Sequence, residues 1–482
     1  MTDARAQLGT KYSQLSAMLI GQESVFTPQH WNKYNIHVTE ETTVLSPTRD
    51  NAEWGRKIVF TQPKRATGTM SYLLRLEIGS SGSRTGGTGA GLGLVATGAA
   101  ATAAYVNNLG DQVCANVVHR YGSSILQEYT GEFAQIYQRV NVNEVNEEGR
   151  NALTLGGLPL AANNSVPEQQ RHVALRDGLV LYVPLDRLWF CQNHDEMWMA
   201  EAYSTEGEIE IELARIEDVV YNAIAADPRP SPFNSALDIP PILSAQLIAR
   251  EVTLTVPEKM ARLEYYETDR GMLCRFLDIE HQARIFNGNG GAGNRELRVD
   301  LDNIRLDSVE LYFMIRRVRG SVANTAHGGI DEDYAGDNLQ GPVFDFSTVA
   351  TTGPVAQGSQ LGGVAGVQRI DMLDDTLVNY RLEANGKRLY DNQNELVGRA
   401  WVRKFYHSDS QPRSPVHIIS FSLYPSDTKN STGFQNFANL GKATLVLTLP
   451  DWATGESKQV DVFSHSNNII VSRRGDVVKS LK

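Results

Sequence analysis

One order of short strand-like segments occurs twice along the 482-residue chain, and this repetition limits the possible folds more than any other feature. In each half, strand pairs precede a long Gly-rich stretch, at 79–104 and at 318–367. Each half also contains an apolar strand that stops at a proline, Pro184 or Pro425. Many short strands with long connections and few helices are typical of sandwiches and jelly rolls. The sequence therefore predicts an all-β chain with short helices and one such unit in each half.

Two segments alternate apolar and polar residues and so identify their inward faces. Residues 208–213 alternate glutamate with isoleucine or leucine, and residues 443–449 place leucine at every second position near their end. A period of two indicates a strand with one buried face. We expect six side chains to lie in sandwich cores: Ile209, Ile211, Leu213, Leu445, Leu447 and Leu449.

Turn and helix signals are few. Asn385-Gly386 separates two strand-like runs and predicts a tight hairpin. Residues 132–148 carry apolar side chains at i, i+3 and i+7, counted from Phe133, which favours a helix. Pro257-Glu258 is typical of a second helix start. The proline-rich stretch 227–241 indicates a connection that crosses the surface.

No catalytic, cofactor or metal signature is convincing. Gly91 to Ala96 fits a dinucleotide motif loosely, but more small residues follow where that motif needs a helix. His194-Asp-Glu near Cys191 is more simply a polar turn than a metal site. The acidic stretch from Asp331 resembles a calcium loop, but an alanine occupies a ligand position. We therefore assign no catalytic residue, no cofactor and no metal ligand.

Charge and cysteine content narrow the functional class. The chain has 45 basic and 56 acidic residues and a net charge of −11, which argues against direct nucleic acid binding. Its 3 cysteines are far apart, which suits a reducing compartment better than a disulfide framework. We see no signal peptide and no run of about 18 strongly apolar residues. A soluble protein made and used inside a cell is expected.

A family resemblance rests mainly on residues 425–449. There a proline ends one strand, an alternating strand begins later, and six residues fill a Thr-Gly-x-x-Asn-Phe pattern between them: Thr432, Gly433, Phe434, Gln435, Asn436 and Phe437. This segment resembles the major capsid proteins of large nucleocytoplasmic DNA viruses, of the iridovirus-like and phycodnavirus-like groups. That family usually continues with Ser-Arg, where this chain has Ala438-Asn439.

Two further segments are similar to the same family. Residues 54–60, leading into 72–78, resemble its first strand pair. Glu251-Val252, followed by Glu258 to Met260, is like the strand-to-helix turn that ends its first barrel. The order of elements follows the family over most of the chain.

The resemblance implies a double jelly roll, that is, two tandem eight-stranded antiparallel jelly rolls. We divide the chain into an N-terminal arm (1–27), a first jelly roll (28–245), a connecting strand and helix (246–270) and a second jelly roll (271–482). It also implies a non-enzymatic major capsid protein that forms homotrimeric, pseudo-hexameric capsomers in the icosahedral shell of a large double-stranded DNA virus.

The partners implied are neighbouring capsomers, penton and minor capsid proteins, with an internal membrane beneath the shell into which the chain does not insert. The protein would be made in the host cytoplasm and reside in the virion. Phe233, Phe344 and Phe346 are our predicted anchors between subunits, although each could instead pack on its own barrel.

A second class of function is a two-domain β-sandwich that binds or cleaves carbohydrate. It would need a paired-carboxylate cleft or an aromatic binding face. The tryptophans are scattered beside strands and turns, and core or interface packing explains them more simply: Trp54, Trp189, Trp198, Trp401 and Trp452.

Overall fold

The computed structural model describes residues 39–48, 52–62, 64, 67–79, 101–105, 109–141, 153–154, 179–192, 197–224, 227–231, 240–267, 271–291, 293–317, 377–394, 397–407, 416–425, 427, 432–452, 454 and 457–479. All structural statements below concern these residues.

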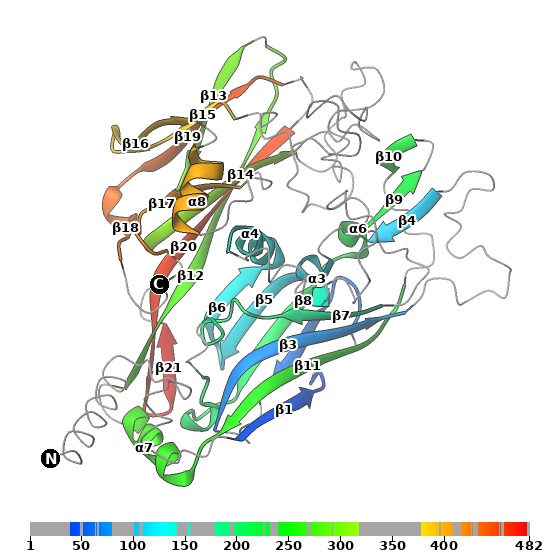
Figure 1. Cartoon of the computed structure of the whole chain (residues 1–482), viewed down its shortest axis with the longest axis vertical. Helices are drawn as coiled ribbons and strands as arrows, with labels where there is room; N and C mark the ends of the chain where they lie inside the picture. The colour runs from blue at the N-terminus through cyan, green and yellow to red at the C-terminus, as the bar shows by residue number, and fades with distance from the viewer. Residues whose placement is uncertain are drawn as a thin grey trace.

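The first half forms a sandwich of two four-stranded antiparallel sheets, at the lower right of Figure 1. One sheet has the order β1–β11–β3–β7 and the other β2–β8–β5–β6. Their bounds are β1 (Thr39–Leu45), β2 (Lys57–Thr61), β3 (Gly68–Ile78), β5 (Cys114–Tyr121), β6 (Ser124–Thr130), β7 (Leu179–Pro184), β8 (Gly207–Leu213) and β11 (Ile242–Thr253).

The second half repeats this arrangement at the upper left of Figure 1. Its sheets follow the orders β12–β20–β14–β17 and β13–β19–β15–β16, with β18 beside β14 and β21 beside β20. The prediction of two tandem eight-stranded jelly rolls is confirmed. The strands are β12 (Met272–Asn287), β13 (Asn294–Asp300), β14 (Asp307–Arg317), β15 (Asn379–Ala384), β16 (Lys387–Asn394), β17 (His417–Ser420), β18 (Gln435–Asn436), β19 (Ala443–Pro450), β20 (Ser457–Arg473) and β21 (Asp476–Lys479).

The local turn and helix signals are found where they were expected. Asn385 and Gly386 join β15 to β16 with φ angles of 50° and 74°, the left-handed pair that a type I′ hairpin turn requires. The helix expected from residue 132 is α4 (Gly131–Asn141), and α7 (Val256–Glu267) places Pro257 in its first turn. The other helical segments are α3 (Leu109–Val113), α6 (Ile216–Val219), α8 (Val402–Tyr406), a π turn η5 (Val397–Trp401) and 3-10 turns at Ala200–Ala202 and Ala438–Leu440.

Two stretches expected as connections contain strands. β10 (Asp227–Ser231) lies inside the proline-rich stretch 227–241, and β4 (Ala101–Tyr105) ends the Gly-rich stretch 79–104; both flank β9 (Val220–Ile224) in a third sheet. Prolines are tolerated in β10 because it is an edge strand whose register with β9 is irregular. Proline content alone therefore gave the wrong prediction for this segment.

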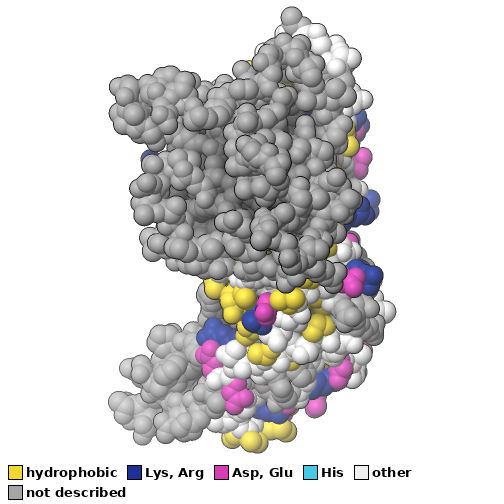
Figure 2. Space-filling model, turned by 90° about the vertical axis from the view of Figure 1, so that its right-hand side faces the viewer, with side chains coloured by type: hydrophobic (Ala, Val, Ile, Leu, Met, Phe, Trp, Pro, Cys, Tyr) yellow, Lys and Arg dark blue, Asp and Glu magenta, His cyan; other side chains and the backbone are white. Residues whose placement is uncertain are grey.

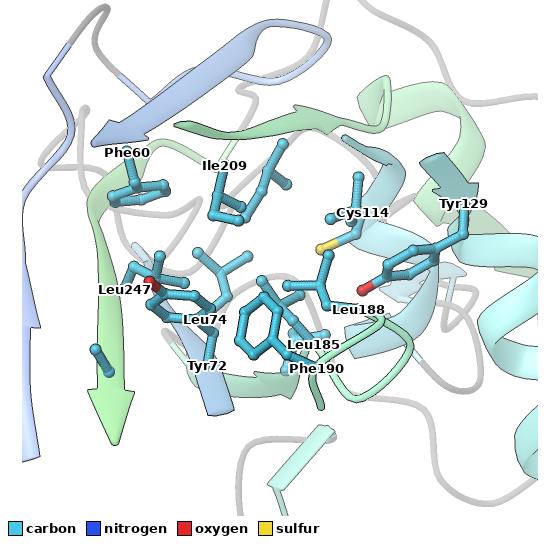
Figure 3. Close-up of a cluster of buried hydrophobic side chains, with 14 of the residues drawn as sticks. Phe60, Tyr72, Leu74, Cys114, Tyr129, Leu185, Leu188, Phe190, Ile209 and Leu247 are labelled. Atoms are coloured by element: carbon cyan, nitrogen blue, oxygen red, sulfur yellow. The ribbon is translucent and has the colours of Figure 1, made fainter. Parts of the chain in front are cut away.

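Each sandwich encloses its own hydrophobic core, and the six predicted inward side chains are all buried. In the first core, Phe60 and Ile209 from one sheet point toward Tyr72, Leu74 and Leu247 from the other (Figure 3). The second core contains the leucines of β19. Alternation in the sequence thus identified the inward faces correctly.

A single pair of long strands connects the two cores. β12 and β20 are paired without interruption from Met272↔Ser472 to Asn287↔Ser457. At one end of this ribbon, Phe276 and Ile470 belong to the first core, while Val462 in its middle belongs to the second core. The sequence patterns described above did not identify this ribbon.

The division of the chain between the two jelly rolls is a proposal. β11 is hydrogen-bonded between β1 and β3 along most of its length, including its residues from Gln246 onward. We therefore propose that α7 and the residues after it make the connection, rather than the whole of 246–270. In the described part of the chain, no helix is long and apolar enough to cross a membrane.

The inward face of β19 gives the first testable prediction. Leu447 has no exposed surface in the second core, so Leu447→Asp would bury an unpaired carboxylate and should prevent folding. Leu389→Asp is the matched control, because Leu389 lies on the same sheet and is 41% exposed. Soluble yield and circular dichroism should be lost for the first variant and kept for the second. A normally folded Leu447→Asp chain would show that the face is wrongly assigned.

Candidate assembly surfaces

The distinctive features of the described residues are surfaces rather than a pocket. Among them, no group of three or more His, Cys, Asp or Glu side chains lies close enough together to hold a metal ion. Each sheet, however, has a second face turned away from its core. Three of these outer faces, together with one edge of the second jelly roll, differ sharply in chemistry and are described in turn.

The six motif residues from Thr432 form a latch between β17 and β19. Thr432 Oγ1 accepts a hydrogen bond from the backbone N–H of Tyr424 at 2.9 Å. Gly433 has φ 150°, and a Cβ there would lie 2.5 Å from the carbonyl oxygen of Phe421, so only glycine fits without a shift. The latch thus fixes the start of the connection at two adjacent positions.

The second part of the motif ties the same connection to β14. Gln435 and Asn436 form β18, and Asn436 donates a side-chain hydrogen bond to Asp307 Oδ1 at 2.6 Å. Phe437 is buried in the second core, with its ring edge against Phe421. Phe434 alone has a half-exposed side chain that the latch does not use. The structure therefore brings the predicted motif residues together as a structural element.

An exposed group of large apolar side chains surrounds this latch and the adjacent α8. Trp401 and Phe405 lie on η5 and α8 with ring centroids 5.9 Å apart, and Val402 between them is buried against β17. We call the exposed set the aromatic edge; each member is at least half exposed: Trp401, Phe405, Leu423, Tyr424 and Phe434. It lies on the side of the second jelly roll formed by α8, β17 and β18, at the left of Figure 1.

The outer face of the β1–β11–β3–β7 sheet carries an apolar row. Cross-strand pairing aligns Val44 with Ile248, Ile248 with Leu73, and Leu73 with Pro184, so the row crosses all four strands. These four residues, which we call the apolar row, are exposed or half-exposed, while their neighbours along each strand face the core. Figure 2, which looks onto the side at the right of Figure 1, shows hydrophobic side chains among charged ones in the lower half of the molecule. A solvated sheet face is ordinarily polar.

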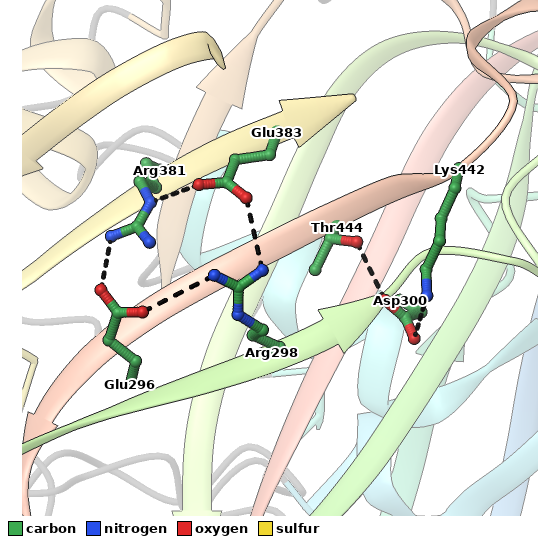
Figure 4. Close-up of polar contacts among 7 residues, drawn as sticks. All are labelled: Glu296, Arg298, Asp300, Arg381, Glu383, Lys442 and Thr444. Carbon is green, nitrogen blue, oxygen red and sulfur yellow. Dashed lines mark hydrogen bonds and ion pairs between the residues drawn. The ribbon is translucent and has the colours of Figure 1, made fainter. Parts of the chain in front are cut away.

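The outer face of the β13–β19–β15–β16 sheet is charged and self-compensated (Figure 4). Arg381 donates to Glu383 at 2.6 Å and to Glu296 at 2.8 Å, and its hydrogen bond lowers the pKa of Glu296. Burial would raise the pKa of Asp300, but hydrogen bonds and charges from the neighbouring Thr444 and Lys442 hold it below its usual value. The network pairs three acids with three bases: Glu296, Asp300, Glu383, Arg298, Arg381 and Lys442.

The outer face of the β12–β20–β14–β17 sheet is covered by the first jelly roll. The apolar side of α4 packs there, and the cluster includes these buried residues: Phe133, Ile136, Val140, Tyr312, Met314, Val402, Val416, Ile418 and Phe463. We call this contact the seam. Because it buries apolar side chains of both jelly rolls against each other, the two jelly rolls form one body rather than two separate domains on a linker.

A polar chain crosses the seam within this apolar contact. Both ring nitrogens of His407 contact oxygens, Nδ1 at 2.7 Å from Asn141 Oδ1 of α4 and Nε2 at 2.8 Å from Glu310 Oε1 of β14. Tyr312 donates to the other oxygen of Glu310 at 2.6 Å. These buried groups are paired with one another, as burial of polar atoms requires. This series of polar contacts fixes the orientation of α4 on the second jelly roll.

Two histidines are fully buried, one in the seam and one in the first core. His465 packs against Phe133 and Tyr137 in the seam, and burial together with nearby Arg187 lowers its pKa to about 3. Burial in the first core lowers the pKa of His119 to about 3, and its Nδ1 accepts a hydrogen bond from Trp189. Both histidines are therefore neutral in the folded chain at neutral pH.

The structure does not describe the predicted interface residues, and it contains two surfaces that were not predicted. Phe233, Phe344 and Phe346, and the stretch 318–367, lie outside the described residues, so their role between subunits stays a prediction. The seam and the apolar row were not predicted. The alternating pattern of 71–77, in which Leu73 falls on the polar side, was the available signal for the row.

Comparisons with known proteins place this fold among viral capsid structures. No family model matches the sequence, and none of the curated proteins matches it. The PBCV-1 protein VP54 has a TM-score of 0.65 at 11% identity, covering 95% of this chain and 100% of that one. The Faustovirus major capsid protein has a TM-score of 0.63 at 12% identity, covering 93% and 92%. A chain of the Sputnik virophage structure has a TM-score of 0.53 at 9% identity, covering 92% and 88%.

The neutral histidines give a prediction for pH dependence. Their pKa is about 3 in the folded chain, against about 6.5 in an unfolded one. Between these pH values the unfolded chain binds more protons than the folded chain. The free energy of unfolding is therefore unaffected by these histidines above about pH 6.5 and falls as the pH drops below it. Each histidine should cost about 2 kcal/mol at about pH 5.

The measurement is urea unfolding at several pH values. His465→Gln and His119→Gln should each reduce the slope of unfolding free energy against pH by about 1.4 kcal/mol per pH unit below about pH 6. Their effect at neutral pH, where only packing changes, is the internal control. An unchanged slope in both variants would mean that these histidines are not buried in the neutral form.

Proposed function

We propose that this chain is a major capsid protein, the structural subunit of an icosahedral double-stranded DNA virus shell. The observation that carries the proposal is the pair of eight-stranded jelly rolls joined by the β12–β20 ribbon and the seam. This architecture extends over nearly the whole length of chains from the PBCV-1 capsid and of the Faustovirus major capsid protein. A structural rather than catalytic role follows for the described residues, whose conspicuous surfaces are faces and edges.

The double barrel suggests a homotrimer. Each chain contributes two similar sandwiches that are held rigidly side by side. Three chains around a threefold axis therefore place six similar sandwiches in a ring. Such a pseudo-hexameric capsomer can tile a hexagonal lattice, and it closes by cyclic symmetry with heterologous contacts. The seam supports this proposal, because it prevents the two barrels of one chain from moving apart.

The remaining parts of the proposal concern location and partners. Neighbouring capsomers, penton and minor capsid proteins would surround the trimer, and an internal membrane would lie beneath it without receiving the chain. We propose assembly in the host cytoplasm and residence in the virion. The net charge of −11 favours contacts with protein over direct contacts with packaged nucleic acid.

Light scattering on the purified chain tests the assembly state. We expect a particle of three times the 53.2 kDa chain mass at micromolar concentration, with a hexagonal outline in negative stain. An obligate interface of this kind should persist on dilution, since such interfaces are large and partly apolar. A stable monomer at micromolar concentration would contradict the capsomer.

A further inference from the structure

We propose that the apolar row of one copy receives the aromatic edge of the next copy. This inference rests on the proposed function, because it names the surfaces through which three copies would join. The row belongs to the first jelly roll and the edge to the second, so each chain offers one of each.

The apolar row has the composition of a covered surface. Soluble monomers rarely expose contiguous apolar strips across a sheet, yet here Val44, Ile248, Leu73 and Pro184 are aligned by strand register. Polar pairs border the row on both sides: Arg75 with Glu77, and Arg250 with Glu40. An apolar centre with a polar rim is the usual anatomy of a protein interface.

The aromatic edge has the composition of an interface centre. Trp and Tyr dominate binding hot spots, and the edge exposes Trp401, Tyr424 and two phenylalanines. The motif latch and the buried Val402 hold these side chains on a rigid base. Little ordering entropy is lost when such preorganised side chains are covered.

The two surfaces lie on opposite sides of the molecule. In Figure 1 the elements of the aromatic edge are at the left, whereas the β1–β11–β3–β7 sheet is at the lower right. Two different patches on opposite sides suit a head-to-tail contact, which closes into a ring under cyclic symmetry.

Charge supports this pairing over other occupants. Residues 397–406, which carry the aromatic edge, include three basic and no acidic residues. The edge strand β1 beside the apolar row has two acidic and no basic residues. Lys404 and Glu40 are exposed, and Glu40 lies on the face of β1 that carries Val44, so opposite charges would meet at the rim of the contact and set its orientation.

The first experiment places a charge in each surface separately. Val44→Asp in the row, or Phe405→Asp in the edge, should weaken trimer assembly at least about tenfold, because the contact would bury an unpaired carboxylate. Val478→Asp is the matched control, since Val478 is 52% exposed and Val44 is 53% exposed, and it should still form trimers. Circular dichroism checks that every variant is folded.

Mixing the two variants identifies the geometry. A Val44→Asp chain keeps its aromatic edge and a Phe405→Asp chain keeps its row, so an equimolar mixture should recover dimers through one intact contact but no closed trimers. If the contact were instead a twofold one through a single patch, mixing the two variants would produce no dimers that neither variant forms alone.

Charge reversal gives an independent test at the rim. Glu40→Lys alone and Lys404→Glu alone should each weaken assembly, and the double variant should restore it, since the exchanged charges attract again.

The outcomes separate this inference from the proposed function. If the wild-type chain is a trimer and both charged variants still form trimers, the row and the edge do not meet and the inference is overturned, while the capsomer stands. If the wild-type chain is monomeric, the proposed function itself fails. Loss of trimers in both variants with recovered dimers in the mixture supports the inference.

Discussion

The uninterrupted pairing of β12 with β20 is the interaction on which the rest of the structure depends. One ribbon supplies side chains to both cores, Phe276 and Ile470 to the first and Val462 to the second. The core of the first sandwich therefore includes side chains from strands that belong to a sheet of the second. The relative position of the two jelly rolls follows from this packing and from the seam, since in the described residues no strand of the first jelly roll is paired with the ribbon.

This sharing explains the polar character of β20. Its middle carries Ser464, His465 and Ser466, which would suit a solvated loop by composition, yet all three are buried. Ser464 bonds to Ser308 and to Ser466, while His465 packs beneath α4. The contact of His407 with Asn141 crosses the seam and specifies one docking arrangement, because any other would leave these polar groups unpaired. The seam is thus held by apolar area and oriented by polar contacts.

Sequence patterns predicted what depends on local periodicity. Leu445, Leu447 and Leu449 alternate and are buried, and Asn385-Gly386 forms its turn. The same reasoning missed most of β20 and misread β10, because partners distant in sequence decide whether a polar or proline-rich segment joins a sheet. The motif from Thr432 was recognised as a pattern, but its mechanical role as a latch depends on Asp307 and Phe421, which no local spacing reveals.

The outer sheet faces differ in whether the chain itself buries their apolar side chains or neutralises their charges. The face under α4 is buried, and the face around Arg381 neutralises its own charges, so neither needs a partner. The apolar row cannot be satisfied in this way, since no charge rearrangement removes exposed Val44 and partly exposed Leu73 from water. The aromatic edge, on the opposite side of the molecule, likewise exposes apolar side chains to water. In the assembly that we propose, these two dissimilar surfaces would be covered by repetition, each copy covering the next.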